Sequence, residues 1–565
     1  EFEGDYTLVL FSFVKQLKKS PEQLGKEIGE LLLKNNPELF SSYNVIKGFL
    51  NLVVADRYWL DFLQSNYSNR SPGVRPSVNK TIIVEYSSPN TNKPLHLGHL
   101  RNNFLGWSVA EILKVTGHKV IKTAIMNDRG IHICKSMVAW QRFGNGATPD
   151  STGIKGDHFV GDYYVLFGTE LKKEVETLMA TGTTKDEAEK NAPLMQAAQK
   201  MLVDWENGDP EVRALWEKMN GWVYEGFNET YKKIGSDFDK NYFESSTYLM
   251  GKEIVEEGLA KNVFFKKEDG SVWIDLTSDG LDEKLVLRKD GTSVYITQDL
   301  GLADKKYEEF HYYQSFHVIA DEQNYHMKVL KLILKKLQKP YADGIYHLSY
   351  GLVELPTGRM KTREGTVVDA DEIIEELIKV AKDKTEELGK VKDFNPGELI
   401  ELYDTIALGA LKFFLLRVDP KKRMLFNPEE SIDFHGFTGP FVQYTHARIK
   451  SILRKEIAGV SRQSAVGSSQ PAVSSPLLPK EKELIVLLEQ YESILGQALE
   501  EHNPSVVAIY AFNVAKVFNA FYTEHSVMSA ESEEKKVLRL KLSELTANVI
   551  AASMALLGVK VPERM

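Results

Sequence analysis

The sequence contains little cysteine, no long hydrophobic run and no excess of positive charge. Its single cysteine, Cys134, excludes an internal disulfide and a cysteine-rich zinc site, and it fits a reducing cytosol. The longest apolar candidate, Ile406–Leu416, is interrupted by Lys412 and is shorter than the ~20 residues that span a membrane. No secretory leader is visible, so we expect a cytoplasmic protein without a membrane anchor. Because residue 1 is a glutamate, we also expect the natural N-terminus to lie upstream.

The charge balance and the length limit the class of protein. A formal net charge of −9 argues mildly against nucleic-acid binding, because phosphate contacts need clustered lysine and arginine, although one local positive face remains compatible with it. A chain of 565 residues with 43% apolar and 26% charged residues has room for several domains with sizeable cores. No internal repeat is apparent. The totals therefore predict a multidomain globular protein.

A strand, a loop and a helix follow one another near residue 90. Ile82–Tyr86 is apolar and β-branched except for Glu85, which is typical of a buried parallel strand. Apolar residues then recur at helical spacing over Leu97–Val115, Gly117 offers a stop, and a second apolar run, Val120–Met126, follows. These elements predict a right-handed βαβ unit whose first loop lies where such folds bind ligands.

Two histidines stand at the start of the predicted helix. His96 and His99 are three residues apart, and Gly98 between them lets a flat group lie on the backbone, so together they can donate to phosphate oxygens. The alternatives are a metal pair or two surface histidines, and an isolated motif of this kind favours those. A metal site lacks its usual cysteine or Glu/His partners here, and the strand–loop–helix context favours phosphate.

The same stretch resembles the signature of class I aminoacyl-tRNA synthetases in its arginyl-tRNA synthetase version. The matching residues are Ser88-Pro89-Asn90, Lys93-Pro94 and His96-Leu97-Gly98-His99-Leu100-Arg101. The resemblance implies a Rossmann-like catalytic domain that uses ATP with Mg²⁺. It also implies that His96, Leu97, Gly98 and His99 contact ATP.

A basic segment, Pro356–Gly365, stands where class I enzymes carry a second signature, Lys-Met-Ser-Lys-Ser. By composition alone it reads as a solvated charge run. The resemblance implies instead that Met360 and Lys361 contact ATP and that Lys361 and Arg363 stabilise charge on the α- and β-phosphates. The second lysine of the signature is missing, as in many arginyl enzymes, and Lys93 is the residue thought to replace it.

A tyrosine and a carboxylate share one face of a further predicted helix. Tyr295 and Asp299 are four residues apart, and a carboxylate can accept two charged hydrogen bonds from a guanidinium. An ordinary surface pair is the alternative. The stretch is similar to the arginine-binding Tyr and Asp of the family, and the resemblance adds Gln323, Glu85, Ser87 and Asn90 to the arginine site. Glu85 also needs a partner, because a charge inside an apolar strand is costly to bury.

Three domains are predicted in chain order. Residues 1–78 form a small α+β domain, either a tRNA-contacting domain, as the resemblance implies, or a generic packing module. Residues 79–395 form the catalytic domain, with a helical insertion near 150–220 and a last strand at Leu352–Leu355. Residues 396–565 form an all-α anticodon-binding domain with an exposed loop at Ser461–Pro479. Further predicted elements are strands at Tyr6–Phe11 and Phe49–Val54, a strand pair over 285–292, and helices at Pro21–Asn35, Arg57–Ser65, Ala188–Trp205 and Leu478–Leu499.

The start of the C-terminal domain carries a candidate RNA contact. Thr438–Ile449 resembles the first anticodon-binding helix of arginyl-tRNA synthetases, and the resemblance implies contacts from Tyr444, Ala447 and Arg448. An aromatic beside basic residues can stack an unpaired base and bind its phosphate, whereas aromatics at helical spacing are more often core. We expect Tyr444 to face the ligand and Phe441 to be core.

The resemblance spans nearly the whole chain and implies ATP-dependent activation of L-arginine and transfer to arginine tRNA, by a protein that we expect to be a monomer. The carboxylate of arginine would attack the α-phosphate of ATP, so catalysis would depend on positioning and electrostatics rather than on a general base. The alternatives are a class I synthetase for another amino acid, a nucleotidyltransferase that needs no tRNA, and a catalytically silent tRNA-binding paralogue.

Overall fold

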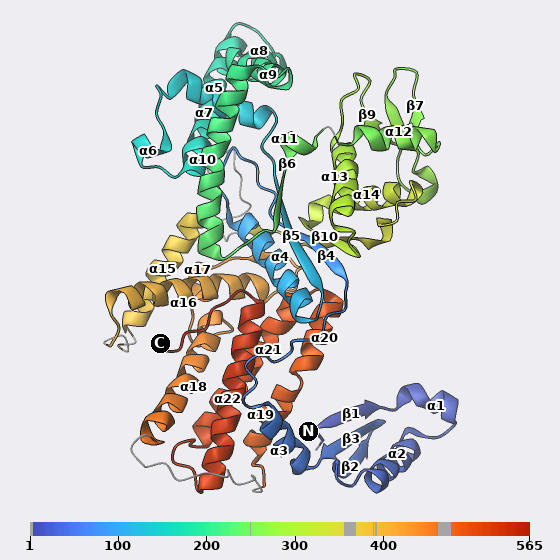
Figure 1. Ribbon diagram of the computed structural model, residues 1–565, viewed down its shortest axis with the longest axis vertical. Coiled ribbons are helices and arrows are strands. Elements are labelled where there is room, and N and C mark those ends of the chain that lie inside the picture. The colour runs from blue at the N-terminus through green and yellow to red at the C-terminus, as the bar shows by residue number, and fades with distance from the viewer. Residues whose placement is uncertain (1–3, 249, 355–368, 388, 390–392, 461–475) are drawn as a thin grey trace.

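The computed structural model describes residues 4–248, 250–354, 369–387, 389, 393–460 and 476–565, and Figure 1 shows their arrangement. A parallel sheet with helices around it occupies the centre. A long helical bundle lies below it, a helical region rises above it, and a small N-terminal module packs beside the bundle.

The central sheet is the predicted Rossmann-like sheet. Its five strands are all parallel and lie in the order β11-β10-β4-β5-β6. The predicted βαβ unit is confirmed, since α4 connects the neighbouring strands β4 and β5. The register sets His317 of β10 beside Glu85 of β4, so two polar side chains meet at the carboxyl ends of adjacent strands. The strands are β4 (Thr81–Glu85), β5 (Lys119–Met126), β6 (Lys240–Phe243), β10 (Gln314–Ala320) and β11 (Ile345–Tyr350).

Helix α4 (Leu97–Val115) has the predicted bounds and is central to the molecule. Most of its residues are buried, because it packs on the sheet at one side and on bundle helices at the other. A side chain at Gly106 would collide with the Tyr86 ring, so this glycine permits the close approach of α4 to the end of β4. The buried guanidinium of Arg101 donates to the carbonyls of Pro420 and Lys422, at 3.2 and 2.8 Å, which ties α4 to the later chain.

The helices between β5 and β6 form the upper left region in Figure 1. They begin and end outside the predicted 150–220 interval. The single helix predicted over Ala188–Trp205 is divided, because Pro193 lacks an N–H and starts a new helix. The helices are α5 (Ile131–Phe143), α6 (Pro149–Thr152), α7 (Gly156–Ala180), α8 (Lys185–Asn191), α9 (Pro193–Glu206) and α10 (Pro210–Ile234).

The segments between β6 and β10 and between β10 and β11 form a second region beside the sheet, and the first of them contains a small antiparallel sheet of order β7-β8-β9. The strand pair predicted over 285–292 is shorter than expected, because after β9 only an isolated bridge joins Leu287 and Ser293. The strands are β7 (Phe265–Lys266), β8 (Val272–Ile274) and β9 (Lys284–Leu287). The helices are α11 (Glu244–Thr247), α12 (Lys252–Ala260), α13 (Tyr295–Phe310) and α14 (Asn324–Lys336), with 3-10 turns η1 (Thr277–Asp279), η2 (Asp321–Gln323) and η3 (Ala342–Gly344).

The prediction that Leu352–Leu355 is the last strand of the catalytic sheet is wrong. The edge strand is β11, and the Gly351 N–H then donates to the carbonyl of Pro420 at 2.9 Å, which directs the chain away from the sheet. As a result β12 (Val353–Glu354) pairs with β13 (Met424–Leu425) in a separate two-stranded sheet. The neighbouring helices are α15 (Ala370–Glu387) and α17 (Pro428–Ser431).

The N-terminal module contains a three-stranded antiparallel sheet of order β1-β3-β2 around a small core of Leu10, Leu24, Leu50 and Leu52. The predicted helix at Pro21–Asn35 and strand at Phe49–Val54 have the expected bounds, whereas α1 and β2 were not predicted. Its helix α3 packs on the bundle helices α19 and α22. The elements are β1 (Tyr6–Val9), α1 (Phe11–Leu17), α2 (Pro21–Asn35), β2 (Phe40–Ile46), β3 (Phe49–Val54) and α3 (Asp56–Asn66).

The C-terminal region is the predicted helical bundle. The helix predicted over Leu478–Leu499 is broken at Gln490. Within the described residues, only α21 is long and apolar enough to cross a membrane, and it packs against α18, α19, α20 and α22 as a core helix does. The helices are α16 (Pro396–Leu416), α18 (Gly439–Val460), α19 (Pro479–Glu489), α20 (Tyr491–Glu501), α21 (Pro504–Glu524) and α22 (Glu533–Leu556).

Candidate active site

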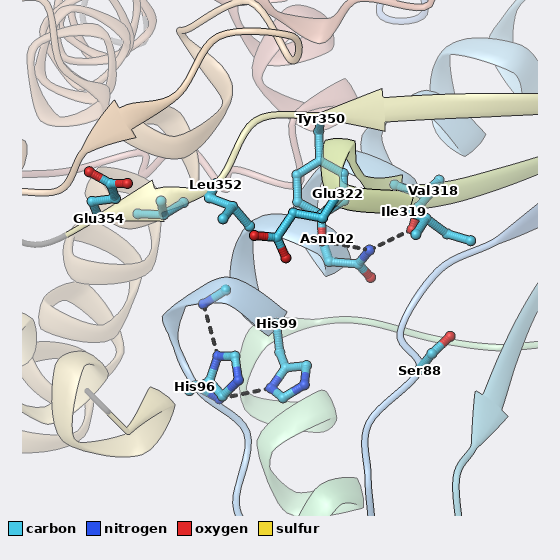
Figure 2. Close-up of a pocket in the computed structure, with 13 residues that line it drawn as sticks. Ser88, His96, His99, Asn102, Val318, Ile319, Glu322, Tyr350, Leu352 and Glu354 are labelled. Carbon is cyan, nitrogen blue, oxygen red and sulfur yellow. Dashed lines mark hydrogen bonds between the residues drawn. The ribbon is translucent and has the colours of Figure 1, made fainter. Parts of the chain in front are cut away.

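Two cavities open at the carboxyl ends of β4 and β10. The first, here called the histidine cavity, has a volume of about 470 Å³. Figure 2 shows His96 and His99 on its lower side, below Val318 and Ile319 of β10 and Tyr350 of β11. It is lined by Ser88, His96, Gly98, His99, Asn102, Val318, Ile319, Ala320, Glu322, Tyr350, Leu352, Val353 and Glu354.

The two histidine rings are held as neutral hydrogen-bond donors. His96 is the N-cap of α4, and its Nδ1 accepts from the Gly98 N–H at 3.2 Å, while His99 Nδ1 accepts from the His96 N–H at 3.1 Å. Burial, followed by the charge of Lys93, lowers the pKa of His96 to about 3, and burial holds the pKa of His99 well below its ordinary value. Because each Nδ1 accepts, the remaining proton of each ring sits on Nε2.

The other residues predicted to contact ATP are placed differently. Gly98 lines the histidine cavity, but the Leu97 side chain is fully buried in the hydrophobic core, so only its backbone is available. Lys93 is partly buried, and burial lowers its pKa. Met360, Lys361 and Arg363 lie outside the described residues.

The second cavity, here called the carboxylate cavity, has a volume of about 360 Å³ and shares Ser88 and Ile319 with the first. It brings together four of the predicted arginine-binding residues, Glu85, Tyr295, Asp299 and Gln323. Its remaining lining residues are Ile125, Asn127, Glu244, Thr247, Gln298, Leu302, Ala303, Lys306, His317, His326, Met327 and Leu330.

Glu85 forms the buried floor of the carboxylate cavity. Its carboxylate pairs with Lys306 Nζ and lies 3.0 Å from His317 Nδ1, which supplies the partners that a buried strand charge needs. Burial acts to raise the pKa of Glu85, but Lys306 and His317 outweigh burial and lower it to about 2. Glu85 is therefore ionised, and Lys306 and His317 already occupy its carboxylate.

Asp299 and Tyr295 lie on one face of α13, as the spacing predicts. Asp299 Oδ2 lies 2.6 Å from His326 Nε2, and the Tyr295 side chain is largely exposed at the mouth. Burial raises the pKa of a further lining carboxyl, Glu244, to about 7. The sequence reasoning did not find Glu244 or His326.

Ser87 and Asn90 do not line the carboxylate cavity. The Ser87 hydroxyl is buried and lies 2.7 Å from the Tyr231 hydroxyl. Asn90 lines a third cavity of about 360 Å³, which adjoins the carboxylate cavity through Asn127, Tyr295 and other shared residues.

A cluster of charges connects α7, α15 and the first histidine. His158 Nε2 lies 3.0 Å from Asp369 Oδ2, and the Asp369 backbone forms an antiparallel bridge with His96. Hydrogen bonds to Asp157 and then Asp369 raise the pKa of His158 to about 10. Asp157, His158 and Asp371 lie close enough together to ligate a metal, but Lys155 Nζ lies 3.3 and 2.6 Å from the two carboxylates. The geometry therefore suits an ion-pair cluster.

The predicted RNA contacts lie on α18, far along the chain from both cavities. The Arg448 guanidinium lies over the Tyr444 ring, 4.9 Å from its centroid. Ala447 is buried. Phe441 is partly buried and packs on Phe512, in agreement with a core position.

Some cavity-lining residues that were not predicted lie at helical spacing from predicted ones. Lys306 continues the helix face of Tyr295 and Asp299, since positions 295, 299, 302 and 306 follow helical spacing and all line the carboxylate cavity. Asn102 lies one turn beyond His99, and its amide donates to the Val318 carbonyl at 2.7 Å. His317, Tyr350 and Glu322 had no such spacing, because the sheet and the turn after β10 bring them in.

Comparisons with known proteins match the region that contains the two cavities and the C-terminal bundle to known families. Residues 63–427 match the model of the catalytic domain of "tRNA synthetases class I (R)", and residues 442–565 match the DALR anticodon binding domain. The chain is 52% identical to the arginine–tRNA ligase of Parabacteroides distasonis and 53% identical to that of Amoebophilus asiaticus. Each of these matches covers 100% of this chain and 94% of the relative.

Solved structures agree in fold. The arginyl-tRNA synthetase of Thermus thermophilus superposes with a TM-score of 0.79 at 25% identity, covering 100% of this chain and 95% of that one. The arginyl-tRNA synthetase of Plasmodium falciparum has a TM-score of 0.74 at 16% identity, covering 99% and 91%, and it shows the shared fold.

Proposed function

The chain belongs to the class I arginyl-tRNA synthetase family and is an ATP-using arginine–tRNA ligase, and we propose that its two adjoining cavities hold the two small substrates. The observation that carries this proposal is that Ser88 and Ile319 line both cavities, so the cavities adjoin at these two residues. One cavity presents neutral donors that suit phosphate, and the other presents carboxylates that suit a cation. A bond between the two substrates can form where the cavities meet.

ATP occupies the histidine cavity. Nε2–H groups of His96 and His99 donate to α-phosphate oxygens, where charge develops during attack. Val318, Ile319 and Leu352 offer an apolar wall to the base. Lys93, Lys361 and Arg363 add positive charge, and Met360 and the backbone of Leu97 and Gly98 complete the ATP contacts.

ATP would bring Mg²⁺ to the histidine cavity. Glu322 and Glu354 line the histidine cavity and offer the oxygen ligands that this ion takes, so they fit a Mg²⁺–ATP complex. When bound, the ion would neutralise charge on the phosphates.

Arginine occupies the carboxylate cavity. Asp299 accepts hydrogen bonds from the guanidinium, and Tyr295 and Gln323 fix its orientation beside the floor that Glu85 forms. Ser87 supports this floor through the turn after β4, and Asn90 acts from the adjoining cavity. This arrangement directs the arginine carboxylate towards Ser88 and the α-phosphate.

The reaction needs no general base for its first step. A carboxylate oxygen bonds to the α-phosphorus as the bond to pyrophosphate breaks, which gives arginyl-adenylate and diphosphate. The 2′-hydroxyl of the terminal adenosine of arginine tRNA then attacks the acyl carbon, and AMP leaves.

The tRNA spans the bundle and the catalytic region. Tyr444 stacks an anticodon base, Arg448 binds the adjacent phosphate, and Ala447 shapes the contact between them. Residues 1–78, 79–395 and 396–565 act as the tRNA-contacting, catalytic and anticodon-binding domains of a monomer. A cytoplasmic location agrees with the single, buried Cys134.

Arginine-dependent ATP–pyrophosphate exchange tests the proposal. We expect exchange with arginine when arginine tRNA is present, and none with lysine or glutamate. Asp299→Asn should raise the KM for arginine with little effect on the KM for ATP, because it removes one accepting charge. An unchanged KM for arginine in this variant, or exchange with another amino acid, would overturn the assignment of the cavity.

A further inference from the structure

His326 reaches the carboxylate on which the proposed arginine site depends. It lies in the first turn of α14, follows Gln323 by three residues, and lines the carboxylate cavity. Its Nε2 is 2.6 Å from Asp299 Oδ2, and the two side chains are 29% and 39% exposed. The pair is therefore open to an incoming ligand.

The charges around this pair leave Asp299 as the main acceptor for a cation. Glu85 is buried and paired with Lys306 and His317, so its charge is already balanced. Glu244 faces the same cavity, but burial raises its pKa to about 7, so it is only partly ionised near neutrality. Tyr295 contributes a neutral hydroxyl.

We propose that His326 is a positioning residue that occupies Asp299 while the cavity is empty and gives up this carboxylate to the arginine guanidinium, losing a proton. The inference rests on the proposed arginine site. The arginine guanidinium and the imidazolium form of His326 are both cationic N–H donors, and two cations at one carboxylate repel each other. Loss of the imidazolium proton to solvent removes this repulsion and leaves a neutral ring beside the substrate.

The titration of His326 agrees with this geometry. The hydrogen bond to Asp299 raises the pKa of His326, although burial opposes it. A guanidinium at Asp299 replaces that bond with a like charge, so the pKa falls on binding. Arginine affinity should therefore increase with pH, by at most about tenfold per pH unit, and binding should release up to one proton.

Calorimetric titration of the full chain with free arginine from pH 6 to 8.5 tests the inference. The binding enthalpy of the unchanged protein is measured in two buffers that differ in ionisation enthalpy, and the difference gives the number of protons released. His326→Gln keeps a neutral donor at Asp299 and should bind arginine more tightly than the unchanged protein at pH 6, with a weaker dependence on pH than the unchanged protein shows. Two control variants, Glu244→Gln and His311→Asn, should retain the pH dependence, since His311 lies at the far end of α13.

The outcomes separate this inference from the proposed function. No proton release, or a His326→Gln variant with the original pH dependence, would overturn the role of His326. If the Glu244→Gln variant lost the pH dependence of arginine affinity, this dependence would be assigned to Glu244, and the inference would also be overturned. If Asp299→Asn binds arginine as the unchanged protein does, the proposed site itself fails.

Discussion

The two histidines at the start of α4 illustrate how the backbone determines the chemistry of a side chain. Each Nδ1 accepts a backbone N–H, and burial prevents protonation, so both rings present Nε2–H and stay neutral. A fixed neutral donor stabilises charge in a transition state and is less strongly hydrated than a charged group. The rings are therefore prepared before substrate binds.

We predict that His99→Ala lowers the rate constant of adenylate formation about 10²- to 10³-fold with little change in the KM for arginine, because a donor acting in the transition state is lost. At saturating arginine, the rate of the unchanged protein should show no inflection near pH 6.5 from these rings. Single-turnover adenylation measures both effects. An equal loss in arginine affinity would contradict the role.

Glu85 is a charge inside a strand that depends on two distant partners. We predict that Glu85→Gln lowers the free energy of unfolding by about 3–5 kcal/mol, because Lys306 is left charged and buried without its carboxylate. Urea denaturation measures the loss. The double variant Glu85→Gln/Lys306→Met should recover part of it, and a double variant as unstable as the single one would exclude this explanation.

At the scale of elements, an ion pair holds the start of α7 against the residue that precedes α15. His158 of α7 binds Asp369, whose backbone in turn bridges to His96. The pair thus joins the helical region above the sheet to the loop that carries the first histidine. Its contribution should depend on pH, since the raised pKa of His158 is about 10.

We predict that His158→Gln loses on the order of 2–4 kcal/mol of stability near pH 6 and much less near pH 10. Because the pKa of His158 is higher in the folded than in the unfolded protein, His158 contributes its full stability below the unfolded pKa of about 6.5. This contribution decreases as the pH rises and is lost as the pH passes through the folded pKa of about 10. The difference in urea midpoint between the two proteins, followed from pH 6 to 10, measures it. A difference that is constant with pH would refute the prediction.

At the scale of the whole molecule, the proposed RNA contact and the chemistry lie in different regions. Tyr444 is on α18 of the bundle, whereas both cavities lie at the carboxyl ends of β4 and β10. Figure 1 shows α18 below the central sheet. We predict that Tyr444→Ala raises the KM for arginine tRNA about tenfold or more, since stacking of a base contributes ~1–3 kcal/mol, and leaves arginine affinity unchanged. Aminoacylation kinetics measure the first effect and calorimetry the second.

The Tyr444→Phe variant is the matched control, because it keeps the ring beneath Arg448. It should bind tRNA nearly as the unchanged protein does. A Tyr444→Phe variant as impaired as Tyr444→Ala would assign the effect to the hydroxyl rather than to stacking.

The sequence by itself determined the parts that depend on neighbouring residues. Periodicity and the stop at Gly117 predicted the bounds of α4, the strand–loop–helix pattern located His96 and His99, and helical spacing put Tyr295 and Asp299 on one face. These features follow from backbone geometry over a few residues, so a local pattern is enough to predict them.

Only the tertiary structure decided which distant groups meet. The register of β10 against β4 brings His317 to Glu85 across 232 residues, and the packing of α14 on α13 brings His326 to Asp299. The diversion of Val353–Glu354 to β13 has the same origin, because strand pairing depends on a segment about 70 residues later that no local pattern reveals. The chemistry of the cavities therefore depends on contacts between segments far apart in the chain.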